Sequence, residues 1–229
     1  MEWSSTRKGD GIMSTFDLIM AAAGVSKSSS SITYIGSTSS DHLDTLVLTC
    51  PAGTQSGDLG IIFTTENEGG SFTGPSGWTT LYSYTSEDNS CYCYYKILTS
   101  TADISITGGT GGDSYQTASL QVFRGASMVA YNKSTATAGS TYTVCPSLSG
   151  FVSGKDYVLV GLHATYSSSE GIPSGYTNTI KAGSSSSYSM ADAAFKLANS
   201  ASMGGVAFSG TPASPGEGMC SSTIRLISS

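Results

Sequence analysis

The sequence is short of charge. Asp, Glu, Lys and Arg make up 11% of its 229 residues, Lys and Arg together number 10, and the formal net charge is −6. Binding to a nucleic-acid backbone needs several clustered cations, so this composition argues against a nucleic-acid partner. The sequence also lacks any uninterrupted apolar run of about 18 residues, the length that crosses a bilayer, so we expect no membrane partner.

Side chains suited to catalysis are few. His42 and His163 are the only histidines, and the nucleophile motif G-x-S-x-G is absent. Paired acidic residues fall in expected turns, where carboxylates are ordinary solvated surface or, less often, calcium ligands: Glu66 with Glu68, and Glu87 with Asp88. We therefore predict that the protein is not an enzyme and has no catalytic residues.

Cysteine is present five times, an odd number in a chain that is not disulfide-dense. Cys91 and Cys93 form a C-x-C pair, but a structural zinc site needs a second pair at suitable spacing, and the sequence has none. We expect the thiols to be small buried apolar groups, with no metal and no cofactor. Free thiols favour folding in a reducing compartment.

The first 31 residues read differently from the rest. Ser14 and Thr15 followed by Asp17 predict the start of a short helix, and Gly24 predicts its end. So short a helix is marginal alone, so its apolar residues are expected to dock on a larger surface: Phe16, Leu18, Ile19 and Met20. Asp17 interrupts the apolar stretch and disfavours a cleaved signal peptide. Met13 is a second candidate start codon.

What the sequence has is an internal repeat. Pro75-Ser76-Gly77-Trp78-Thr79 recurs 98 residues later as Pro173-Ser174-Gly175-Tyr176-Thr177. Further landmarks follow in the same order at nearly the same offset: Cys50 with Cys145, Asp58 with Asp156, Tyr95 with Phe195, Ile104 with Val206, and Leu120 with Ile224. Collinear matches of this kind predict the duplication of one unit.

Each copy contains about seven short apolar or alternating runs bounded by Gly, Pro, Ser, Asn or Asp, which are typical of a sandwich. Ala118, Leu120 and Val122 alternate with polar residues and predict a half-buried strand. The segment 190–199 has helical composition, but its match to the strand 91–98 overrides that propensity. We predict an all-β, antiparallel β-sandwich made of repeat 1 (32–125) and repeat 2 (126–229), packed as one unit behind an N-terminal arm (1–31).

Trp78 and Tyr176 share one repeat position, and we expect each ring to cover the end of its core rather than to bind a ligand. Tyrosines in Ser- and Gly-rich loops are better candidates for surface contacts, because such loops adapt to a partner. The candidates are Tyr115, Tyr166 and Tyr188.

Four short motifs, in order, resemble a module common among tailed-bacteriophage virion proteins. They are Gly57-Asp58-Leu59, Pro75-Ser76-Gly77-Trp78-Thr79, Tyr94-Tyr95-Lys96 and Phe123-Arg124-Gly125, and the last has Phe where the module usually has Tyr. The likeness covers residues 32–229. It implies a virion structural protein, assembled in the bacterial cytoplasm and carrying no catalytic residues. A tail fibre or tail-tip component with a role in host adhesion is the first expectation.

Two other functions stay open: a head decoration protein, and a carbohydrate-binding sandwich module outside any phage. The implied partners are other virion proteins, further copies of the chain, and a host surface glycan.

Overall fold

The computed structural model describes residues 31–42, 45–67, 70–86, 89–107, 115–137, 143–165, 171–180, 182–183, 189–209 and 218–229. The expected arm helix, with Phe16, Leu18, Ile19 and Met20, lies outside these residues. All the regular elements of the described residues are β-strands, so the all-β prediction is confirmed there. Those residues contain no helix long and apolar enough to cross a bilayer.

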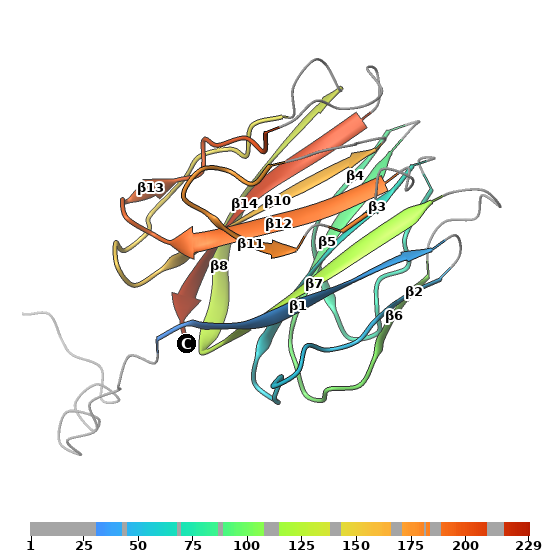
Figure 1. The fold of residues 1–229 in the computed structure, drawn as a ribbon, viewed down its shortest axis with the longest axis horizontal. Coiled ribbons are helices and arrows are strands. Elements are labelled where there is room, and N and C mark those ends of the chain that lie inside the picture. The colour runs from blue at the N-terminus through green and yellow to red at the C-terminus, as the bar shows by residue number, and fades with distance from the viewer. Residues whose placement is uncertain are drawn as a thin grey trace, which may run out of the picture.

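Two five-stranded antiparallel sheets make the body, and each comes from one half of the chain (Figure 1). Sheet I has the order β1 (Thr33–His42), β7 (Gln116–Arg124), β3 (Leu59–Glu66), β5 (Ser90–Ile97), β4 (Thr79–Thr85). Sheet II has the order β8 (Ala126–Thr137), β14 (Gly218–Ser228), β10 (Tyr157–Thr165), β12 (Ser189–Leu197), β11 (Thr177–Ile180). Two ribbons complete the fold, β2 (Thr45–Leu48) with β6 (Ile104–Thr107) and β9 (Leu148–Ser149) with β13 (Ser202–Met203).

The two sheets share their strand order and two pairs of irregularities. A β-bulge separates Thr80 from Tyr82 in β4, and the same bulge separates Asn178 from Ile180 in β11. A second pair of bulges lies in β1 between Tyr34 and Gly36, and in β8 between Met128 and Ala130, with pairing to β7 and β14 on both sides of each bulge. Because bulges are placed by local sequence and re-aim a strand, their recurrence gives both sheets the same geometry.

Strand pairing corrects one match of the repeat. Ile62 lies opposite Leu120, and its counterpart Val160 lies opposite Thr223. Leu120 therefore corresponds to Thr223, and the expected match to Ile224 is wrong by one residue. The shift matters because successive strand residues face opposite sides, and Ile224 points between the sheets while Leu120 points away.

Each sheet is covered on both faces, which gives four layers rather than two. Between the sheets lies a cluster that includes Phe63, Leu159 and Ile224. The outer face of sheet I packs on the β2–β6 ribbon through residues such as Leu46 and Ile106. The outer face of sheet II packs on β13 and its neighbouring segments, in a cluster that contains Cys145, Phe151, Met203 and Phe208.

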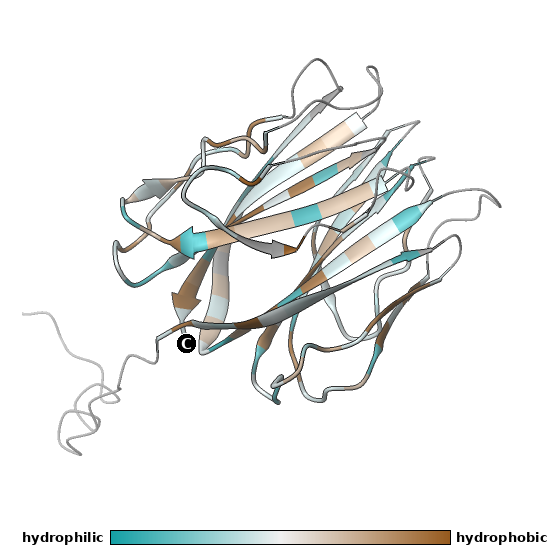
Figure 2. Ribbon diagram, in the orientation of Figure 1, coloured by the Kyte–Doolittle hydropathy of each residue, from teal (hydrophilic) through white to brown (hydrophobic). Residues whose placement is uncertain are grey.

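The double cover overturns the prediction of a half-buried β7. Gln116 to Phe123 are all buried, with Ala118, Leu120 and Val122 under the β2–β6 ribbon. The polar residues that alternate with them in β7 face sheet II. There the Ser119 hydroxyl donates a hydrogen bond to the Ala191 carbonyl at 2.7 Å. Figure 2 shows hydrophobic and hydrophilic positions following one another along β7 and β12. Burial on both faces explains why alternation did not mean exposure.

The second repeat is more irregular than predicted. The segment 190–199 does form a strand, β12, as its match to β5 indicated. Val206 and Ser209 form only single bridges, Val206 with Cys145 and Ser209 with Gly171, where the first half has the β2–β6 ribbon.

A partly buried tryptophan beside a cavity

Of the three tyrosines expected to contact a partner, Tyr115 alone is among the described residues. It is half-buried, and its backbone N–H donates to the Asn67 side-chain oxygen at 2.7 Å, so it helps to order the end of β3. Tyr166 and Tyr188 lie outside the described residues. The sites below were not among the sequence-based candidates.

A buried polar network joins the sheets at their centre. The Tyr82 hydroxyl lies 3.0 Å from His163 Nε2 and 2.7 Å from Ser222 Oγ, and His163 Nδ1 lies 3.0 Å from the Thr64 carbonyl. A carbonyl only accepts, so Nδ1 carries the hydrogen of the neutral ring and Nε2 accepts from Tyr82.

His163 has a structural role in this network. Its side chain is fully buried, and burial lowers the pKa of its imidazole to about 3, although the hydrogen bond to Thr64 opposes that shift. The ring is therefore neutral near pH 7 and out of contact with solvent. A histidine in this position does not reach a substrate as a general base.

Four of the five thiols fill core positions, as expected. Cys91, Cys93, Cys145 and Cys220 are buried and free, whereas Cys50 is partly exposed. Burial raises the pKa of all five thiols, that of Cys145 and Cys220 to about 12. In the part of the chain that the structure describes, no group of three or more His, Cys, Asp or Glu side chains is arranged to hold a metal ion.

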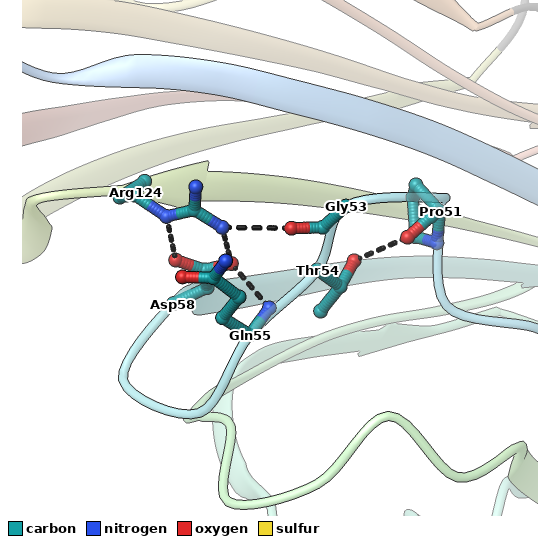
Figure 3. A network of polar contacts seen from close by, with 6 residues as sticks. All are labelled: Pro51, Gly53, Thr54, Gln55, Asp58 and Arg124. Carbon is teal, nitrogen blue, oxygen red and sulfur yellow. Dashed lines mark hydrogen bonds and ion pairs between the residues drawn. The ribbon is translucent and has the colours of Figure 1, made fainter.

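Asp58 and Arg124 hold one end of sheet I together (Figure 3). The guanidinium donates from Nε to Oδ1 and from a terminal nitrogen to Oδ2, both at 2.9 Å, and Oδ2 also accepts from the Gln55 N–H at 2.7 Å. Sheet II has an analogous pair, in which Arg225 donates to Asp156 at 2.8 Å. Arg225 sits at a different register position from Arg124, so the ion pair recurs through a residue that strand pairing does not align.

Trp78 lies at the same end of sheet I. Gly77 precedes it with a φ of 76°, which an L side chain rarely adopts, and the Trp78 N–H donates to the Pro75 carbonyl at 3.1 Å. The indole packs partly on the core of sheet I, beside Leu98. One part of the ring covers the end of the core, as predicted. The ring also lines a cavity.

The cavity has a volume of about 310 Å³ and is lined by buried or partly buried apolar side chains, here called its floor, and by mostly exposed polar side chains, here called its rim. Trp78, Leu98 and Ile104 contribute apolar surface. The rim carries hydroxyls and one charge of each sign: Ser76, Lys96, Thr99, Ser100, Asp103 and Ser105. Neither Lys96 nor Asp103 belongs to the two ion pairs found among the described residues; Asp103 is exposed and Lys96 is partly buried.

The equivalent ring in sheet II, that of Tyr176, has different surroundings. Tyr176 is 7% exposed and belongs to the core, and Lys196 Nζ lies over its face at 4.7 Å from the ring centroid. Val158 stands where sheet I has Gly60. A Cβ on Gly60 would lie 2.7 Å from the Trp78 ring, so the glycine makes room for the larger indole.

No protein-family model matches the chain, and no curated protein matches it. Among solved structures, the chain is similar to one titled "Crystal structure of PBSX exported protein XepA", with 10% sequence identity. The likeness covers 86% of this chain and 87% of that one, with a TM-score of 0.22. A score this low supports no inference about fold or function.

Proposed function

We propose that this chain is a non-enzymatic virion protein of a tailed bacteriophage and belongs to the tail fibre or tail tip, where it contributes to host adhesion. The observation that carries the proposal is the convergence of the four phage-like motifs at one end of sheet I. Asp58 immediately precedes β3, Trp78 precedes β4, Lys96 lies near the end of β5 and Arg124 ends β7. Residues of all four motifs therefore lie at the same end of sheet I.

Direct contacts support this arrangement. Asp58 and Arg124, 66 residues apart, form the bidentate pair, and Trp78 and Leu98, the residue after β5, both lie against Gly60 of β3. Bidentate charge-assisted bonds fix geometry as well as energy. Motif residues that make such contacts stabilise the fold, as we expect of a structural protein rather than an enzyme.

We further propose that the two sheets descend from one duplicated unit, with repeat 1 over 32–125 and repeat 2 over 126–229. Strand order, bulges and the Pro-Ser-Gly turns support this reading, since the N–H of Tyr176 donates to Pro173 as that of Trp78 does to Pro75.

The two ends of the body lie together, which suits attachment at one end. Ser31, Ile32 and Ser228 line one cavity of about 240 Å³. An arm entering there would dock on the particle and leave the remaining surface to the host. Several copies per particle are expected, as in other repeated assemblies.

Replacing Leu18 and Ile19 by serine in the full chain tests the docking part of the proposal. Incorporation into particles should fall sharply, while near-ultraviolet circular dichroism of the body stays unchanged. Serine replacement of Val47, an exposed residue of the β2–β6 ribbon, is the control and should leave incorporation intact. Normal incorporation of the Leu18/Ile19 variant would contradict arm docking.

A head decoration protein would share this arrangement of motif residues, so the location of the protein in the particle separates the two. The carbohydrate-binding alternative is favoured by one observation, the Trp78 cavity.

A further inference from the structure

We infer that the cavity beside Trp78 binds a neutral saccharide unit. The inference deepens the proposed adhesive function and rests on it for its biological meaning. The ligand class is inferred from the residues that line the cavity. Three features of the site select this chemical class: an accessible aromatic ring, a rim with donors and acceptors, and a limited volume.

The ring of Trp78 is available where that of Tyr176 is covered. Lys196 lies over the Tyr176 ring, whereas the described cation–ring contacts, made by Lys133, Lys196 and Arg225, place no cation over Trp78. Gly60 allows the indole to lie back against sheet I. The ring can therefore present apolar surface to a ligand, as aromatic residues with one packed and one wet side do at binding surfaces.

The rim complements hydroxyl groups. Lys96 only donates hydrogen bonds, ionised Asp103 only accepts them, and the Ser76, Thr99, Ser100 and Ser105 hydroxyls do both. A sugar ring has an apolar face of C–H groups and a margin of hydroxyls that donate and accept, so it matches floor and rim together. A purely apolar ligand would leave both charges unused, and an anionic polymer would meet Asp103 and a net charge of −6.

The size of the cavity agrees with one or two sugar rings. Its 310 Å³ lies at the lower end of the range of roughly 300–1,000 Å³ for small-molecule sites. Asp103 and most rim hydroxyls are solvent-exposed, so we expect modest affinity, with Kd near 1 mM for a monosaccharide.

Tryptophan fluorescence of the full chain tests the inference. Trp3 and Trp78 are the only tryptophans, so Trp3→Phe leaves Trp78 as the sole reporter. Glucose, galactose, N-acetylglucosamine, rhamnose and their disaccharides are titrated separately. We expect a saturable change in emission with at least one of them. Alkylation of Cys50 by iodoacetamide should slow at the same sugar concentrations, because Cys50 lines the same cavity.

Variants locate the binding. Lys96→Ala and Asp103→Ala should each weaken it about tenfold or more, the effect of losing one hydrogen bond to a charged group. Lys196→Ala, the equivalent change in sheet II, should leave it unchanged, and thermal melting confirms that all variants fold.

Two results would overturn the inference: the absence of a saturable response to every sugar, or equal affinity in the Lys96 and Asp103 variants. Neither result affects incorporation into particles, so loss of the saccharide site and loss of the virion role are separable.

Discussion

Thr65 Oγ1 lies 3.1 Å from His163 Nδ1, and these residues occupy the same position in β3 and β10. Equivalent positions touch each other only near a twofold axis, so a pseudo-twofold axis passes between the sheets there. Phe63 and Gly161 are a second such pair, since a Cβ on Gly161 would lie 2.6 Å from the Phe63 ring. At the axis one half supplies the large side chain and the other leaves room.

Gly161→Ala should therefore destabilise the fold. The added methyl group meets a fully buried ring, and overpacking of this kind costs about 1–3 kcal/mol of unfolding free energy. Phe63→Leu in the same chain should recover part of the loss, because it frees the space. Urea unfolding of both single variants and the double variant measures the coupling, and strictly additive effects would refute direct contact.

Stability should fall as pH decreases below about 6.5, the ordinary pKa of histidine. The unfolded chain binds a proton at His163 there, whereas the folded chain does so only near its pKa of about 3. Unfolding is thus favoured across this window, by about 2–3 kcal/mol at about pH 4.5. His163→Gln removes the titration, so its unfolding free energy should depend less on pH between 4.5 and 6.5. Parallel curves for the two proteins would show that His163 does not titrate in this way.

Gly60→Val should displace Trp78 and destabilise sheet I, because even a Cβ would lie 2.7 Å from the indole. Adding Trp78→Tyr copies the Val158 and Tyr176 combination of sheet II and should restore much of the stability. Thermal melting of the single and double variants compares them. A double variant no more stable than Gly60→Val would mean that the ring and the glycine are not matched.

Native thiol titration should label one cysteine of five. Cys50 is partly exposed, while the other four are buried and react only after unfolding. Burial and the nearby Asp103 raise the pKa of Cys50, so its labelling should be slow near pH 7 and faster in alkali. Cys50→Ser should remove the native reaction. Labelling of a second thiol without denaturant would contradict this burial pattern.

Local sequence predicted strands and turns better than it predicted layers. The β5 match identified β12 as a strand, and the Pro-Ser-Gly turns precede β4 and β11 as predicted. Alternation along β7 predicts one exposed face, but a period-two pattern only separates the two faces of a strand and does not show whether either face contacts solvent. Ser119 and its polar neighbours are buried between the sheets, which depends on contacts with Ala191 that no short window contains.

The candidate site was missed for a related reason. Trp78 and Tyr176 occupy equivalent positions in the sequence. The surroundings of their rings differ because β3 has Gly60 where β10 has Val158. Lys96 and Asp103 meet at the cavity only because β5 and the segment before β6 converge there.

The most direct test of the virion role is the copy number and location of this protein in purified phage particles, by quantitative mass spectrometry with antibody-labelled electron microscopy. We predict a small, fixed number of copies at the tail. Hundreds of copies on the head would replace the tail assignment with decoration. Absence from particles would contradict the virion role itself.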